Sequence, residues 1–136
     1  MSTGYNMHDW EFNLPIYMQV GKKKISVAVN WYRNAHYQVS NNAKRKYKKL
    51  IEDQFEGLTK PAGKIHVTYE YYAARNNKPD LDNMTGTVKK FFQDAMVELG
   101  FIEDDNVSII VSTKEKYMGI DRENPRVVAK ITQLEK

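Results

Sequence analysis

Apolar residues recur every three or four positions over one long stretch in the second half of the chain. They are Leu81, Met84, Val88, Phe91, Ala95, Met96 and Leu99. This spacing places them on one side of an α-helix. Gly100 follows directly, and the left-handed backbone that often closes a helix favours glycine there. The pattern therefore predicts a long amphipathic helix that ends near Leu99 and buries one face.

A second, more basic helix is predicted earlier in the chain. Ser40-Asn41-Asn42 can cap its start, because their side-chain oxygens accept hydrogen bonds from free backbone N–H groups. Gly57 and Pro61 end this region. A buried stripe at helical spacing is expected from Ala43, Tyr47, Leu50, Ile51 and Phe55.

The remaining apolar segments are short and rich in aromatic and β-branched side chains, or alternate between apolar and polar residues, as strands do. They cover residues 10–19, 25–30, 64–73, 107–113 and 126–132. A turn is expected at Gly21 to Lys24 and a loop over residues 31–39. This mixed order predicts an α+β fold, in which a small mixed sheet packs with two main helices. Residues 1–136 should form one domain, with residues 1–24 as an N-terminal extension or hairpin.

Length, charge and cysteine content narrow the class of protein. The chain has 136 residues, a formal charge of +4 and no cysteine. The absence of cysteine excludes disulfides, thiolate zinc sites and cysteine nucleophiles, and it fits a reducing interior. No apolar run is long enough to span a membrane, and the N-terminus lacks the pattern of a signal peptide. We expect a cytoplasmic protein with no membrane partner and no small-molecule cofactor.

Two acidic segments flank the long amphipathic helix. The first is K-P-D-L-D-N, with Asp80 and Asp82 one residue apart, and the second is Glu103-Asp104-Asp105-Asn106. If Asp80 to Asp82 is extended, both carboxylates point to one face. For Asp105 to join them, the chain must turn back along the helix, or the helix must start later. Three converging carboxylates would suit Mg²⁺ or Mn²⁺, the hard ions of phosphoryl transfer. In the alternative interpretation, the first pair caps a helix and the second segment is a polar turn.

Basic residues gather outside these acidic segments and favour a polyanionic partner. Such residues contact backbone phosphates without reading sequence, although a solvated face is the alternative for any single lysine. Lys89 lies nearly two helical turns after Asp82, so it is expected close to the same face. The candidate DNA-binding residues are Lys22, Lys23, Lys24, Arg33, Lys44, Arg45, Lys46, Lys48, Lys49, Arg75, Lys78 and Lys89.

Three segments together give the chain a resemblance to a known family. P-D-L-D-N, then L-G-F-I-E-D-D-N-V after the helix, and V-N-W-Y-R-N-A-H-Y upstream resemble the RusA family of Holliday junction resolvases. The resemblance covers roughly residues 25–133. It implies a small α+β homodimer of a bacterium or phage, acting on branched DNA in recombination and repair. It also implies Mg²⁺-dependent cleavage of four-way junctions by paired symmetric nicks, with Mn²⁺ as a substitute.

The resemblance also assigns site residues. The family's catalytic and metal-binding acids fall on Asp80, Asp82 and Asp105, with Asp104 as a possible helper. Its catalytic lysine falls on Lys90 when counted back from Gly100-Phe101, and Lys89 competes for this role. Three other interpretations stay open at this point. They are a non-catalytic module that binds branched DNA, a metal nuclease for other nucleic-acid structures, and an interaction subunit with no nucleic-acid role.

Overall fold

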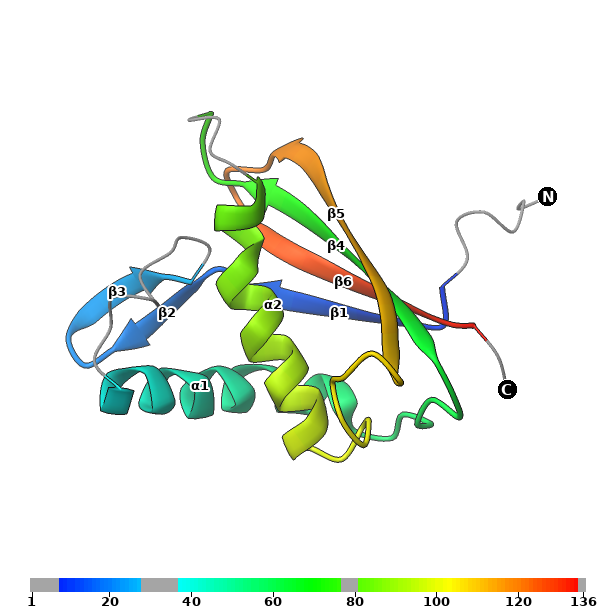
Figure 1. Ribbon diagram of the computed structural model, residues 1–136. Coiled ribbons are helices and arrows are strands. Elements are labelled where there is room, and N and C mark those ends of the chain that lie inside the picture. The colour runs from blue at the N-terminus through cyan, green and yellow to red at the C-terminus, as the bar shows by residue number, and fades with distance from the viewer. Residues whose placement is uncertain (1–7, 28–36, 77–80, 135–136) are drawn as a thin grey trace.

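The protein folds around a four-stranded mixed sheet with helices on one face (Figure 1). The computed structural model describes residues 8–27, 37–76 and 81–134, apart from the side chains at positions 20, 23, 37–40 and 81–84. The strand order is β1-β6-β4-β5, with β4 and β5 parallel and the other two pairs antiparallel. The strands are β1 (Trp10–Pro15), β4 (Ile65–Ala73), β5 (Ile110–Ile120) and β6 (Arg126–Gln133). The predicted α+β class with a mixed sheet and two helices is confirmed.

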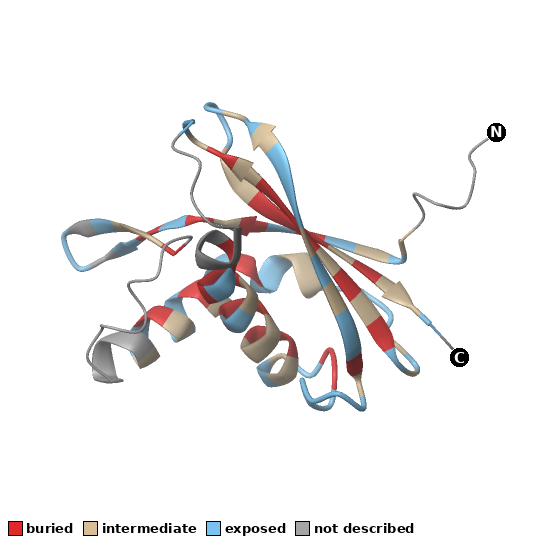
Figure 2. Ribbon diagram, turned by 45° about the horizontal axis from the view of Figure 1, so that its top comes forward, coloured by how far each residue is buried: buried red, intermediate tan, exposed pale blue. Residues whose placement is uncertain are grey.

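The core lies between the sheet and its two helices, α1 (Tyr37–Ile51) and α2 (Leu81–Glu98). Buried residues run along β4 and β6, with three in a row at 69–71 and at 127–129, and others line the inner sides of both helices (Figure 2). Aromatic rings fill the centre, where the Phe12 ring lies 4.5 Å from Phe55, 5.2 Å from Phe92 and 5.7 Å from Phe101 between centroids. These rings join β1 to α2 and to the segments that follow each helix.

The first helix differs from its prediction at both ends. α1 begins at Tyr37, three residues before the predicted cap, and ends at Ile51, where a 3-10 turn, η3 (Glu52–Phe55), follows. Leu50 was predicted to be buried but is 52% exposed. The buried line advances in steps of four from Ala43 to Ile51, and a residue one position before Ile51 is turned about 100° away from it.

The long amphipathic helix is confirmed as α2, which connects the parallel strands β4 and β5. Gly100 closes it with a φ of +76°, and the N–H of Phe101 donates to the carbonyl of Met96 at 2.9 Å. α2 already includes Leu81 and Asp82, so the condition that Asp80 to Asp82 is extended does not hold for these two residues. A helix can start this early because its first N–H groups need no partner within the helix.

Two other strand predictions change in extent. A hairpin of β2 (Tyr17–Val20) and β3 (Lys23–Ser26) turns at Gly21, whose φ is +62°, so the turn is shorter than predicted. Residues 28–36 of the predicted return strand and loop lie outside the described residues. β5 starts later than the predicted 107–113, at Ile110. It also ends later, because residues 114–116, although all polar, continue it to Ile120. No helix in the described segments is long and apolar enough to cross a bilayer.

Candidate functional site

The first acidic segment lies at the start of α2. Asp82 falls in the first turn of this helix, while Asp80 and Lys78 lie outside the described residues and the Asp82 side chain is not described. A carboxylate in the first turn of a helix is favoured, because the free N–H groups give that end a partial positive charge. The strands β4 and β5 also end on this side of the sheet, where the N–H of Asp121 donates to the carbonyl of Ala73 at 2.8 Å.

The second acidic segment forms the loop between α2 and β5, and its neighbouring acids have different contacts. The Asp104 carboxylate accepts hydrogen bonds from the N–H of Asp105 at 2.7 Å and from the Asn106 amide at 3.0 Å. Asn106 in turn accepts from the N–H of Ser108 at 2.9 Å. The Asp105 carboxylate is exposed and has no partner in the part of the chain that the structure describes. Asp104 therefore folds the loop, and Asp105 is available to a ligand.

One chain holds these two segments apart. Asp82 and Asp105 lie at opposite ends of α2 (Figure 1), which is 18 residues and thus about 27 Å long. The loop after α2 leads straight into β5 at the same end, so it does not return along the helix. Within residues 8–27, 37–76 and 81–134, no group of three metal-binding side chains forms. The predicted acidic site stays a prediction, and these distances restrict how it can assemble.

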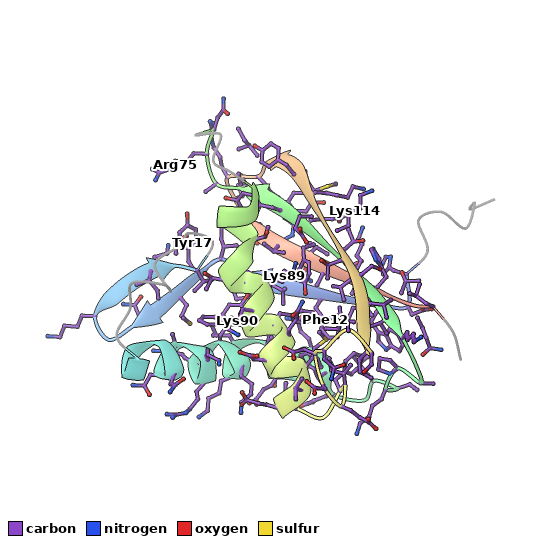
Figure 3. The ribbon with its side chains drawn as sticks, in the orientation of Figure 1. Phe12, Tyr17, Arg75, Lys89, Lys90 and Lys114 are labelled. Atoms are coloured by element: carbon purple, nitrogen blue, oxygen red, sulfur yellow. The ribbon has the colours of Figure 1, made fainter. Side chains whose placement is uncertain are left out.

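The two candidate lysines differ in how their charge is used (Figure 3). Lys89 Nζ donates to Thr113 Oγ1 at 3.1 Å and lies 3.3 Å from Glu115 Oε2, so it binds α2 to β5. It also lies 5.7 Å from the centroid of the Tyr69 ring. Lys90 is turned about 100° from Lys89 along the helix. It is exposed and has no ion pair with any described residue. Only Lys90 has a charge left for an external phosphate.

The basic residues of α1 divide in the same way. Lys44 pairs with Asp94 at 2.8 Å and Lys48 with Glu98 at 3.0 Å, so both fasten α1 to α2. Arg45 donates to Asn42 at 3.1 Å within the helix, and Lys46 and Lys49 are exposed. Lys22, Lys24 and Arg75 are exposed as well, whereas Arg33 and the Lys23 side chain are not described. The candidate DNA-binding set therefore includes side chains that also hold the two helices together.

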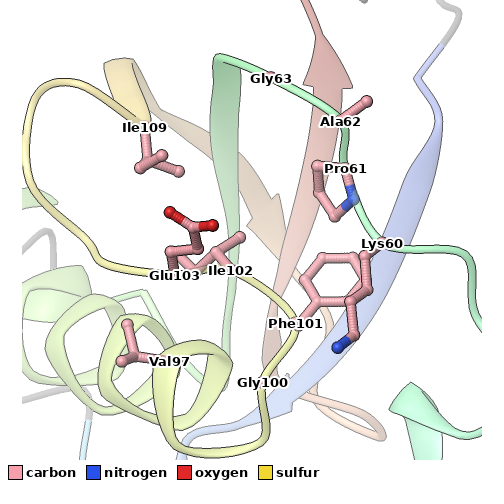
Figure 4. Close-up of a pocket in the computed structure, with 10 residues that line it drawn as sticks. All are labelled: Lys60, Pro61, Ala62, Gly63, Val97, Gly100, Phe101, Ile102, Glu103 and Ile109. Atoms are coloured by element: carbon pink, nitrogen blue, oxygen red, sulfur yellow. The ribbon is translucent and has the colours of Figure 1, made fainter.

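A pocket of about 530 Å³ lies beside the acidic loop (Figure 4). Pro61, Phe101, Ile102 and Ile109 supply apolar parts of its walls. Glu103 lines it as well, from the position just before Asp104 and Asp105. The loop thus packs beside apolar residues, with Glu103 at the pocket and with Asp104 and Asp105 exposed outside it.

Three tyrosines, Tyr17, Tyr71 and Tyr117, come together at the other end of the sheet, and the sequence does not predict this grouping. Burial raises the pKa of the Tyr71 hydroxyl, and the nearby Tyr17 and Tyr117 raise it further. The Tyr71 and Tyr117 ring centroids are 6.1 Å apart. The alternation of residues in β4 predicts the strand that carries Tyr71. Tyr17 and Tyr117 come from distant segments, so no local pattern brings the three residues together. The raised pKa keeps the Tyr71 hydroxyl protonated, so it can donate a hydrogen bond at the end of the sheet where α2 begins.

The sequence was compared with protein-family models and with curated proteins. The family model described as endodeoxyribonuclease RusA matches residues 17–132, which include both acidic segments and both helices. A search of curated proteins found no match. The chain thus carries the sequence features of an endonuclease, an enzyme class that cuts nucleic-acid strands internally. The chain belongs to the RusA family of endodeoxyribonucleases.

Proposed function

We propose that this protein is a Mg²⁺-dependent endonuclease that resolves four-way DNA junctions by paired symmetric nicks, in recombination and repair. The observation that carries the proposal is the family match, because it spans residues 17–132 and so both acidic segments. The exposed Asp105 carboxylate, which has no described partner, also favours an enzyme, because a module that only binds DNA needs no metal ligand.

Asp80, Asp82 and Asp105 are the proposed catalytic and metal-binding residues. Carboxylate oxygens are the ligands that Mg²⁺ prefers, and Mn²⁺ accepts the same set. The free Asp105 carboxylate suits this donor set. Bound there, the ion would lower the pKa of an attacking water and offset charge on the scissile phosphate. Lys90, whose charge is not paired with a described residue, would contact that phosphate.

Two chains are needed to bring these acids together. Within one chain, Asp82 lies at the start of α2 and Asp105 lies beyond its end. About 24 Å of helix separates Asp82 from the point where the loop begins. A two-fold dimer can place Asp105 of one copy beside Asp80 and Asp82 of the other, and it then contains two such sites. Two sites related by a two-fold axis match a junction in which two strands are cut symmetrically.

The edge strand β5 offers a surface for this dimer. Among the described residues it pairs on one side only, with β4, and its exposed large apolar residues are Val111, Tyr117, Met118 and Ile120. A long exposed edge strand of this kind readily pairs with another strand. Two β5 strands related by a two-fold axis run antiparallel, so the start of one lies beside the end of the other. The acidic loop precedes the start of β5, and α2 begins near its end, so this pairing brings the two acidic segments together.

The basic surface would hold the arms of the junction. Lys46 and Lys49 on α1, with Lys22 and Lys24 at the hairpin turn and Arg75 after β4, are exposed. They would contact phosphates without reading base sequence, as recognition by DNA shape requires.

The test is incubation of a labelled four-way junction with the protein, with and without Mg²⁺, beside Asp82→Asn and a linear duplex. We expect paired nicks in the junction alone, which require both Mg²⁺ and Asp82. Tight junction binding without cleavage in Mg²⁺ or Mn²⁺ would favour the non-catalytic module. Preferred cleavage of flaps or RNA would favour a metal nuclease of other specificity.

A further inference from the structure

A hollow of about 680 Å³ lies between the β2–β3 hairpin and the turn that joins β5 to β6. Pockets for ligands of nucleotide size fall in this volume range. The residues that decide its chemistry are Tyr17, Lys24, Ala74, Arg122, Glu123 and Arg126. Three cations therefore line one hollow, with Glu123 as the acid among its lining residues.

Two of the three cations have no acidic partner among the described residues. Lys24 Nζ lies 4.7 Å from the centroid of the Tyr17 ring, which holds its charge at the hollow. Arg122 is exposed and makes no ion pair within the described segments. Arg126 differs, because its Nη1 donates to Asp121 Oδ2 and to the Asn124 carbonyl, both at 2.9 Å. Lys24 and Arg122 are thus left to receive an anion.

The hollow lies at the end of the sheet where α2 begins. Ala74, which lines it, directly follows the end of β4, and Asp121 is bonded to Ala73 by its backbone. The chain then passes through Arg75, which Figure 3 shows near the start of α2. A DNA strand bound at the start of α2 would therefore have this hollow beside it.

We propose that this hollow binds the phosphodiester backbone of a DNA strand next to the position of cleavage, with Lys24 and Arg122 contacting successive phosphates. The proposal rests on the proposed function and extends the DNA surface to the β5–β6 turn. The charge of the hollow favours a DNA strand, because its phosphates are negatively charged and closely spaced, and Lys24 and Arg122 are two cations without acidic partners among the described residues. Such contacts position the strand and carry no sequence information.

The test compares Lys24→Ala/Arg122→Ala with two controls. Lys24→Arg/Arg122→Lys keeps both charges in the hollow. Lys114→Ala/Lys116→Ala removes the same charge from β5, where the register with Thr68 and Glu70 places both side chains on the sheet face away from α2. Affinity for a labelled four-way junction is measured without Mg²⁺ over a series of salt concentrations, so that cleavage does not enter.

We expect the alanine pair to lower the salt slope of binding by about 1 for each cation lost. The charge-conserving pair should keep the slope of the unmodified protein, and the β5 pair should change it less. Equal slopes for the two alanine pairs would overturn the proposal and leave the nuclease function intact. If the unmodified protein bound no junction, both the proposal and the nuclease function would be overturned. Cleavage that requires Asp82, measured separately in Mg²⁺, shows whether the nuclease function stands when the proposal fails.

Discussion

The carboxylate of Asp104 accepts a hydrogen bond from the N–H of Asp105 at 2.7 Å, so two adjacent acids have separate tasks. Asp104 is used within the loop, and Asp105 is left with a free carboxylate. Lys89 and Lys90 differ in the same way: Lys89 pairs with Glu115, whereas Lys90 has no ion pair with a described residue. Each of these differences leads to a prediction.

Asp105→Asn should abolish cleavage and leave the fold unchanged. The amide removes the negative charge from a proposed metal ligand, and we expect the cleavage rate to fall about 100-fold or more. An exposed side chain without partners contributes little to stability, so urea unfolding should stay within about 0.5 kcal/mol of the unmodified protein. Glu103→Gln, one charge lost in the same loop, is the matched control and should keep its activity. Equal activity of both variants would contradict the assignment.

Asp104→Ala should instead act through the loop. It removes two hydrogen bonds that the carboxylate accepts, and we expect about 1 kcal/mol of lost stability in a urea titration. Cleavage should fall less than in Asp105→Asn and recover in part as Mg²⁺ is raised. A loss of activity as large as that of Asp105→Asn, with normal stability, would make Asp104 a ligand instead.

Lys90→Met should reduce the cleavage rate without reducing stability, because its exposed ammonium has no described partner. Lys89→Met should do the reverse, because it breaks the contacts with Thr113 and Glu115 that bind α2 to β5. These groups are partly exposed, so the stability loss should be about 1 kcal/mol or less. Cleavage rates and urea midpoints for the pair decide between the two lysines. If Lys89→Met is inactive and Lys90→Met fully active, the roles are exchanged.

The pair of Glu70 and Lys130 should make stability depend on pH at alkaline values. Glu70 is buried, Lys130 Nζ lies 3.0 Å from its carboxylate, and the hydrogen bond to Glu70 raises the pKa of Lys130 above the ordinary 10.5. A folded pKa above the unfolded value stabilises the fold below pH 10.5 and ceases to do so as pH rises through the folded pKa. Because the Lys130 side chain is 32% exposed, its contribution should be about 1 kcal/mol.

Lys130→Met measures this contribution. In urea unfolding, the variant should be less stable than the unmodified protein at pH 8, and the difference should shrink above pH 10.5. A difference that is constant from pH 8 to pH 11 would show that packing, and not charge, accounts for the effect.

The β5 edge makes a prediction about assembly. Met118→Lys/Ile120→Lys places charge on the exposed apolar part of this strand and should convert a dimer to a monomer in light scattering. Leu58→Lys is the matched control, because Leu58 is similarly exposed but lies in the segment after η3. A dimer that survives the β5 changes would place the interface elsewhere.

The sequence predicted those parts of the fold whose pattern is local. The stripe from Leu81 to Leu99 and the cap at Gly100 determine α2, and the alternation of residues 64–73 determines β4. β5 was cut short because Lys114, Glu115 and Lys116 are all polar, although β4 pairs with them across the sheet. Leu50 was misplaced because helical spacing alone does not say where the partner surface ends.

The candidate site was predictable in its residue types but not in its assembly. The two acidic segments and the length of the helix between them can be read from the sequence. Whether the chain turns back along that helix depends on the parallel pairing of β4 with β5, a contact between distant segments. The hollow at Lys24 and Arg122 joins residues about 100 positions apart, and no local pattern reveals it.

The central claim, that Asp82 of one chain works with Asp105 of the other, is tested most directly by mixing two inactive variants. Asp82→Asn and Asp105→Asn are unfolded together, refolded as a mixture and incubated with a labelled four-way junction in Mg²⁺. In a mixed dimer, one site then carries both changes and the other carries neither. We predict that each variant alone is inactive and that the mixture nicks one strand. A mixture as inactive as its components, beside an active unmodified protein refolded in the same way, would contradict the shared site.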